Sequence, residues 1–255
     1  AGAEVLISSG QACVLYGVAA FSKDGDWIIR EDEKSIEAVL HVLERKKTSY
    51  RLGMPLDIRF LKEGLTSYFE FYEQSGFRMR VDFVSRPPRV SDIERMWECA
   101  LHRQEIDVVD VENLVLLKQT RRVRDYNVIG ALAEVCGLHM DRPEIALTYL
   151  QDYGLLKKAV EKWIVRARNS ERKAVQLILS GAPRSEVVSA LAVEQDALIQ
   201  VDENRVQKIR ERSIGFRYAF ERLKKKWKQE GAALRNQHEQ LRALAAEHFG
   251  KLIND

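Results

Sequence analysis

The chain has 255 residues, of which 45% are hydrophobic and 31% charged, and its formal net charge is +3. This length and apolar content suit one large domain or two smaller ones with buried cores, and the small net charge excludes a polycation that binds nucleic acid through overall charge. The three cysteines, Cys13, Cys99 and Cys136, are far apart, which indicates reduced thiols packed in the cores of a cytoplasmic protein. The sequence has no apolar run of transmembrane length, so we expect no membrane binding.

Strand and helix signals alternate as far as about residue 90. Apolar runs next to turn residues predict strands, and apolar residues at a spacing of three to four predict helices. The predicted strands are Val5–Ser8, Asp26–Arg30 and Pro55–Leu61, and the predicted helices are Gln11–Tyr16, which ends at Gly17, and Ser35–Leu43.

The segment Phe77–Val84 alternates between apolar and charged residues, as an exposed strand does. Its apolar side chains face one way, and Arg78, Arg80 and Asp82 face the other. The Pro87–Pro88 pair then ends the strand.

From about Ser91 the pattern is helical to the end of the chain. Ser91 and Glu94 match a capping box, and Val111–Leu132 fits one or two helices. The sequence therefore predicts an α+β fold, with a small mixed sheet in a core of residues 1–90 and a helical region over residues 91–255.

The sharpest local feature is Asp24-Gly25-Asp26, which follows Ser9-Gly10 after thirteen residues. Residues i and i+2 of a strand share a face, so the two carboxylates would lie side by side and repel each other unless a cation lies between them. Mg²⁺, with oxygen ligands and a bound triphosphate, is such a cation. An Asp-Gly turn without function is the alternative, although Trp27-Ile28-Ile29 continues as a strand.

Two stretches carry a resemblance to a known family. The first is ISSGQACVLYGVAAFSKDGDWII (residues 7–29) and the second is VDVENLVLLKQTRRVRDYNVIGAL (residues 109–132). Together they resemble the minimal nucleotidyltransferases of the DNA polymerase β superfamily, some of which are toxins of toxin–antitoxin or abortive-infection systems. The resemblance implies a nucleotidyltransferase core that residues 91–133 complete, and leaves residues 134–255 as a helical part that binds substrate or a partner.

A third carboxylate on a strand belongs to this resemblance. Asp82 fits because it lies on the polar face of an alternating strand, just before the helical region. Asp57, in the apolar stretch Leu56–Ile58, is the second candidate. Either aspartate has a structural alternative, an ion pair with Arg59 or Arg80.

The resemblance implies two Mg²⁺ or Mn²⁺ ions on Asp24, Asp26 and Asp82, and a nucleoside triphosphate such as ATP as substrate. Ser9 and Gly10 would offer donors to the triphosphate, and Lys23 and Lys118 would neutralise its charge. Lys118 on a solvated helix face is the alternative. Arg78 and Arg80 would contact nucleotide or acceptor, or else balance charge on the sheet.

The stretch Arg205–Lys228 holds ten basic and two acidic residues. This concentration of charge suits the phosphates of an RNA acceptor, and a solvated helix face is the alternative. Four apolar residues within it lie at helical spacing and would pack on the protein or form a homo-oligomer or partner interface: Phe216, Phe220, Leu223 and Trp227.

Two departures from the family pattern support a second function. The family often has Gly-Gly where Ser9-Gly10 stand, and Arg-x-Thr where Ala20-Phe21-Ser22 stand. The alternative to an active enzyme is therefore a catalytically inactive module of the same fold that binds nucleotide or a partner. No metalloprotease, P-loop, dinucleotide-binding or hydrolase motif competes with these two readings.

Overall fold

The computed structural model describes residues 2–103 and 105–253, with side chains as far as residue 250. The chain divides into two compact units. The first, here called the sheet unit, comprises residues 1–12, 21–109 and 209–255, and the second, the helical unit, comprises residues 13–20 and 110–208. The division differs from the boundary expected at residue 90, because the chain returns to the sheet unit at its C-terminal end.

All strands in the described residues belong to the sheet unit and form one mixed sheet of seven strands in the order β3-β4-β5-β2-β1-β7-β6. The pairs β2–β5 and β1–β7 are parallel, and the other pairs are antiparallel. The strands are β1 (Val5–Ile7), β2 (Asp24–Ile29), β3 (Ser49–Gly53), β4 (Ser67–Tyr72), β5 (Arg78–Val84), β6 (Leu101–Arg103) and β7 (Ile106–Val108).

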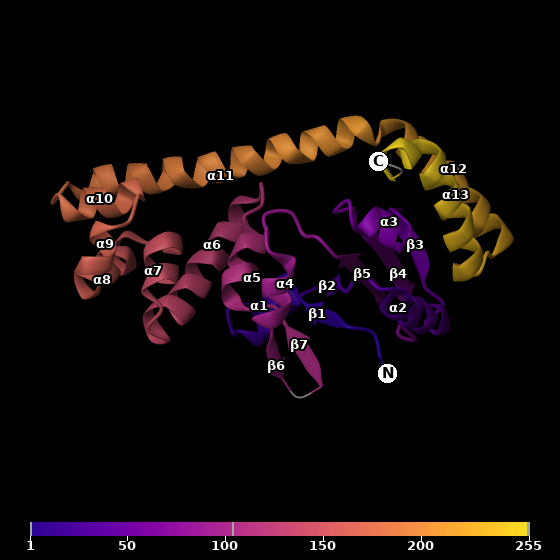
Figure 1. Cartoon of the computed structure of the whole chain (residues 1–255), viewed down its shortest axis with the longest axis horizontal. Helices are drawn as coiled ribbons and strands as arrows, with labels where there is room; N and C mark the ends of the chain where they lie inside the picture. The colour runs from indigo at the N-terminus through magenta and orange to yellow at the C-terminus, as the bar shows by residue number, and fades with distance from the viewer. Residues whose placement is uncertain (1, 104, 254–255) are drawn as a thin grey trace. The chain divides into compact units, whose positions relative to one another are not determined.

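Helices accompany the sheet and make up the second unit (Figure 1). Those of the sheet unit are α2 (Glu33–Arg45), α3 (Ile58–Leu61), α4 (Ile93–Glu98), α12 (Ile214–Glu230) and α13 (Leu234–Ile253). The helical unit holds α5 (Val111–Lys118), α6 (Val123–Leu132), the π-helical segment η1 (Ala133–His139), α7 (Pro143–Tyr149), α8 (Tyr153–Lys162), α9 (Ile164–Arg168) and α10 (Lys173–Leu179). Two helices, α1 (Ser9–Leu15) and α11 (Arg184–Arg212), cross from one unit into the other.

Helix α2 shows how local sequence fixes an element. Asp32 caps it, since its carboxylate accepts from the backbone N–H of Ser35 at 2.7 Å. The predicted apolar positions Ile36, Val39, Leu40 and Leu43 are all buried. The helix prediction is therefore confirmed, and the observed helix is two residues longer at each end.

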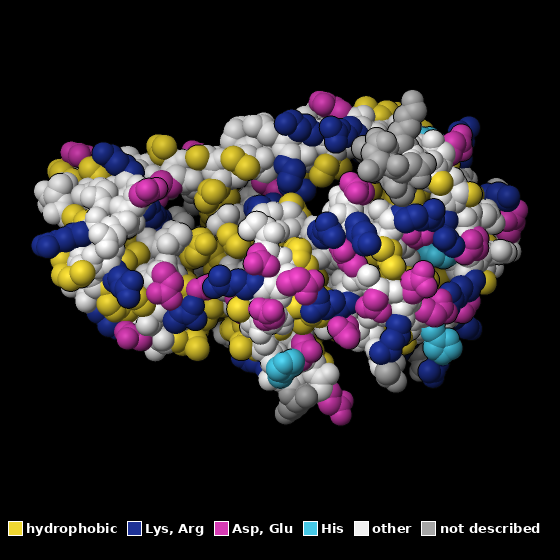
Figure 2. Space-filling model, in the orientation of Figure 1, with side chains coloured by type: hydrophobic (Ala, Val, Ile, Leu, Met, Phe, Trp, Pro, Cys, Tyr) yellow, Lys and Arg dark blue, Asp and Glu magenta, His cyan; other side chains and the backbone are white. Residues whose placement is uncertain are grey.

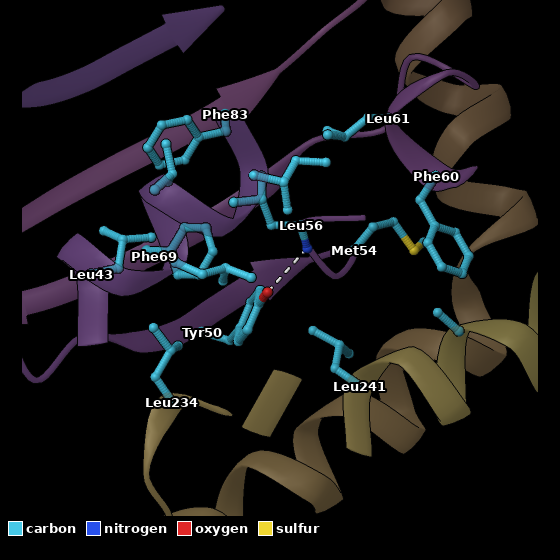
Figure 3. Close-up of a cluster of buried hydrophobic side chains, with 14 of the residues drawn as sticks. Leu43, Tyr50, Met54, Leu56, Phe60, Leu61, Phe69, Phe83, Leu234 and Leu241 are labelled. Atoms are coloured by element: carbon cyan, nitrogen blue, oxygen red, sulfur yellow. Dashed lines mark hydrogen bonds between the residues drawn. The ribbon is translucent and has the colours of Figure 1, made fainter. Parts of the chain in front are cut away.

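The core of the sheet unit joins residues far apart in the sequence (Figure 3). Leu43, Phe69 and Phe83 come from α2 and the sheet, while Leu234 and Leu241 come from α13. Tyr50 is fully buried among them, and its hydroxyl accepts from the backbone N–H of Leu56 at 3.0 Å.

The predicted apolar stripe of α12 lies in the same core. Phe216, Phe220 and Trp227 are buried there, and Leu223 packs against it. Of the alternatives for this stripe, packing on the protein is the one observed. These side chains are accordingly unavailable as an exposed interface.

Three sequence predictions are wrong in this unit. Pro55–Leu61 is a turn followed by α3, because Asp57 caps that helix through the N–H of Arg59. Asp92, rather than Ser91, caps α4. Residues from 91 onward are not uniformly helical, since β6 and β7 form a hairpin on the sheet.

Two further findings concern exposure. Cys13 and Cys136 are buried, but Cys99 is exposed, against the expectation that all three pack in cores. Among the described residues, no helix combines the length and the apolar character needed to cross a membrane.

Candidate active site

The parallel pairing of β2 and β5 brings the three predicted carboxylates together. In the register of these strands Asp26 lies directly opposite Asp82, and Asp24 lies opposite Arg80. Asp24 and Asp26 share a face because they are two residues apart on one strand, and cross-strand partners share that face too. The backbone therefore brings Asp24, Asp26 and Asp82 to one face of neighbouring strands.

Small residues hold the start of β2 against the end of β1. The backbone N–H and the hydroxyl of Ser8 both donate to the carbonyl of Asp26, at 2.9 and 3.0 Å. Ser22 donates through its hydroxyl to the carbonyl of Asp24 at 3.0 Å. A Cβ atom on Gly10 would lie 2.3 Å from Ser22 Oγ, so a side chain there would displace the Ser22 hydroxyl. These contacts fix the backbone on which the aspartates stand.

The predicted phosphate-binding pair differs in detail from the expectation. Ser9 and Gly10 are the first residues of α1 rather than a turn ahead of it, and Ser9 has a positive φ of 48°. Ser8, which the sequence analysis did not single out, is the serine bonded to β2. The N-terminal end of α1 thus begins at the pair, where backbone N–H groups are oriented for anions.

Asp82 has a strongly perturbed environment. Burial raises its pKa to about 7, and the charges of Asp26 and Asp24 add to the rise, while Arg51 opposes it. Arg51 Nη2 lies 3.1 Å from Asp82 Oδ1 and 3.4 Å from Oδ2. An ordinary aspartate is ionised at neutral pH, whereas this one is close to half protonated there.

Asp24 is less enclosed than Asp82, with 43% of its side chain exposed against 17%. Asp24 is loosely paired with Arg80, whose Nη1 lies 3.8 Å from Asp24 Oδ1. Tyr68 stands opposite Asp82 on β4, and its pKa is raised by burial and also by the charge of Asp82. Three aspartates, two arginines and a tyrosine therefore lie on the four neighbouring strands β3, β4, β5 and β2.

The donor set fits a divalent cation in kind. Carboxylate oxygens are the ligands that Mg²⁺ and Mn²⁺ prefer, and the mutual repulsion of the three acids is relieved by such an ion. Among the described residues, however, no three His, Cys, Asp or Glu side chains converge into a metal-binding group. Instead, Arg51 contacts Asp82 and Arg80 contacts Asp24.

The predicted lysines lie in different surroundings. Lys23 is exposed and directly precedes Asp24 on β2. Lys118 is 8% exposed at the end of α5 in the helical unit, so the alternative of a solvated lysine is wrong. Lysine is seldom this buried unless its ammonium group is paired.

Asp57 is a structural residue. Its carboxylate accepts from the N–H and the side chain of Arg59, and from Arg242 Nε of α13 at 2.8 Å. These contacts hold its pKa below the ordinary value against the opposing effect of burial. Asp57 lies on no strand, so its structural alternative, the ion pair with Arg59, is the one observed.

Arg51, which the sequence analysis did not single out, contacts Asp82. It stands where the pairing of β3 and β4 shifts register between Tyr50 and Leu52. Such a bulge aims an additional side chain across the sheet, and a single sequence gives no signal for it.

The basic stretch Arg205–Lys228 spans two helices, and some of its charges are paired within the protein. Ser213 separates α11 from α12, and the stretch divides between the two units. Arg205 pairs with the buried Asp202, and Lys224 binds Glu70 and the carbonyl of Arg51. On the face shown in Figure 2, basic and acidic side chains are interspersed. Eight basic residues of the stretch are exposed: Lys208, Arg210, Arg212, Arg217, Arg222, Lys225, Lys226 and Lys228.

No known protein-family model matches this chain, and no curated protein matches its sequence.

Proposed function

We propose that this protein is a metal-dependent nucleotidyltransferase that moves a nucleoside monophosphate from a nucleoside triphosphate to a hydroxyl group. The single observation that supports the proposal is the pairing of Asp26 with Asp82 on parallel strands, with Asp24 on the same face. Three acids on one face repel one another, and a site of this kind is stable with bound cations. Two Mg²⁺ or Mn²⁺ ions on Asp24, Asp26 and Asp82 meet that need.

When bound, the ions supply charge that stabilises the pyrophosphate leaving group and activates the acceptor hydroxyl. In the transfer itself, the acceptor oxygen forms a bond to the α-phosphorus while the bond from that phosphorus to pyrophosphate breaks. Asp82 would take the proton of the hydroxyl, or would hold the ion that activates this hydroxyl.

The remaining residues serve binding. The backbone N–H groups at the start of α1, including those of Ser9 and Gly10, are donors for phosphate oxygens. Lys23, which directly precedes Asp24, is a positive charge available to the triphosphate. Arg80, beside Asp24, is a further donor on the same face.

RNA is the proposed acceptor. The exposed basic residues of α12, Arg217, Arg222, Lys225, Lys226 and Lys228, support this choice, because phosphate contacts dominate RNA affinity. Lys224 is excluded from this set, since it binds Glu70 and the backbone of β3.

A second candidate is a catalytically inactive module that binds nucleotide or a partner. The observation that favours it is the placement of Arg51 and Arg80 on the carboxylates, where an active site holds its metal ions. Arginines in these positions neutralise the acids without any ion.

The test is transfer of label from each of the four α-labelled nucleoside triphosphates to total RNA, with Mg²⁺ or Mn²⁺, followed by mass spectrometry of the products. We expect RNA that carries an added nucleoside monophosphate, and no product without the metal. Nucleotide binding without transfer would support the inactive module. Absence of any nucleotide binding at millimolar concentration would contradict both candidates.

A further inference from the structure

Arg51 is held at the carboxylate face by contacts on several sides. Its carbonyl accepts from Lys224 Nζ of α12 at 3.1 Å, and the same ammonium lies 3.5 Å from Glu70 Oε1 of β4. The guanidinium stacks over the ring of Tyr68, 5.1 Å from its centroid. The bulge in β3 is therefore fixed at its backbone, and the arginine side chain lies along the sheet toward Asp82.

The contact between Arg51 and Asp82 leaves part of the guanidinium unused. Only Nη2 reaches the carboxylate, at 3.1 and 3.4 Å, so one nitrogen serves both oxygens. Arg51 Nε is buried and has no hydrogen-bond partner among the described residues. An arginine that binds a single anion well uses two nitrogens in a parallel fork, which this pair does not do.

A buried N–H of a charged group that lacks a hydrogen-bond partner raises the free energy of the folded protein. A hydrogen bond to an acceptor removes this penalty. Asp82 cannot supply that acceptor while Nη2 already spans both of its oxygens. A phosphate offers several oxygens in the geometry of the guanidinium fork. The free Nε thus indicates a second anion, distinct from Asp82.

We propose that Arg51 is a resident counter-cation of the site, which holds Asp82 while no divalent ion is bound, releases it when the ion binds, and then binds a phosphate of the substrate through the freed guanidinium. This inference rests on the proposed function. Ion and arginine compete for one carboxylate, so each excludes the other from Asp82. The Arg51 guanidinium then donates to the phosphate instead of to the Asp82 carboxylate.

The competition predicts two affinity changes of opposite sign. Loss of the Arg51 charge should tighten the binding of a divalent ion alone, because the ion no longer displaces a neighbouring cation. The same loss should weaken the binding of a polyphosphate in the presence of the ion. A residue that merely supports the fold would weaken both.

The experiment measures Mn²⁺ affinity by electron paramagnetic resonance and, at saturating Mn²⁺, inorganic tripolyphosphate affinity by calorimetry. Arg51→Gln should bind Mn²⁺ about tenfold more tightly and tripolyphosphate about tenfold more weakly than the unchanged chain. Arg51→Lys keeps the charge but not the fork, so its Mn²⁺ affinity should stay near that of the unchanged chain while tripolyphosphate binding falls. If Arg51→Gln does not fold, Arg51→Lys alone still tests the phosphate contact.

Arg59→Gln is the matched control, because Arg59 also binds a buried aspartate, Asp57, away from the three carboxylates. It should change neither affinity. Equal Mn²⁺ affinity in Arg51→Gln and the unchanged chain would overturn the inference but leave the proposed function standing. Absence of Mn²⁺ binding in every variant would overturn both.

Discussion

The two faces of the central strands differ in what they do with their side chains. On one face Tyr50, Phe69 and Phe83 pack with α2, α12 and α13 into a continuous apolar core. On the other face the same strands carry Asp24, Asp26, Asp82, Arg51 and Arg80, with burial and like charge acting against ionisation of Asp82.

This contrast separates stability from chemistry. The apolar face gains free energy mainly from the burial of apolar surface rather than from charge. The acidic face holds charges at a free-energy cost, and such sites persist where function needs them. Changes to one face should therefore alter measurements that changes to the other leave alone.

The largest effect is expected from the acidic face. Asp82→Asn should lower the transfer rate by several orders of magnitude, because its carboxylate serves mainly the transition state. Asp26→Asn should weaken nucleotide binding as well as transfer, because Asp26 holds the ion that carries the triphosphate. Circular dichroism and melting should show an intact fold. Asp107→Asn on β7 is the control, since it changes a strand aspartate that pairs with His102, and it should leave the rate unchanged. Full activity of Asp82→Asn would exclude it from the mechanism.

On the apolar face, the effect of a substitution should appear as a lower free energy of unfolding. Phe220→Ala should lower the free energy of unfolding by about 3–5 kcal/mol, measured by urea titration, because a fully buried ring is lost from the core. Tyr218→Ala on the same helix is the control, because Tyr218 is 73% exposed and should change stability by less than about 0.5 kcal/mol. Similar values for the two variants would show that α12 does not complete the core.

A smaller effect concerns pH. Folding raises the pKa of Asp82 from 3.8 to about 7, so this group stabilises the fold fully only below its unfolded pKa and destabilises it progressively as pH rises through 7. Asp82→Asn stays neutral. Its stability relative to the unchanged chain, without metal, should rise by about 2 kcal/mol between about pH 5.5 and about pH 8. A pH-independent difference would contradict the raised pKa.

The smallest effect is expected at the outer surface of α12. Changing Arg217, Lys225 and Lys228 to Glu should weaken RNA binding about tenfold or more and flatten its salt dependence, because phosphate contacts are lost. Filter binding at several salt concentrations measures both. Unchanged RNA affinity would show that these residues form only a solvated helix face.

Local signals predicted the parts of the fold that depend on neighbours in sequence. The alternation in Phe77–Val84 gave β5, and the spacing of Ile36, Val39, Leu40 and Leu43 gave α2. Pro55–Leu61 was misassigned because a single side chain, the cap Asp57, outweighs an apolar run. The short strands β6 and β7 exist through pairing on the sheet, which periodicity does not report.

Of the candidate site, only the three aspartates could be predicted from the sequence. The Asp24/Asp26 spacing and the polar face of Asp82 are visible in the sequence, but their adjacency depends on parallel pairing across a long separation. The bulge that directs Arg51 onto Asp82 depends on the register of β3 with β4. The return of residues 209–255 to the sheet unit depends on packing alone.

That return has a consequence for synthesis. The strands of the sheet unit leave the ribosome first, but their apolar face is completed by Phe216, Phe220 and Leu241, which emerge only after residues 110–208 have been made. Throughout that interval the nascent sheet presents an uncovered apolar surface, which is prone to association with other chains. We expect the growing polypeptide to depend on chaperones until its last helices arrive, and a messenger truncated before them to yield insoluble protein.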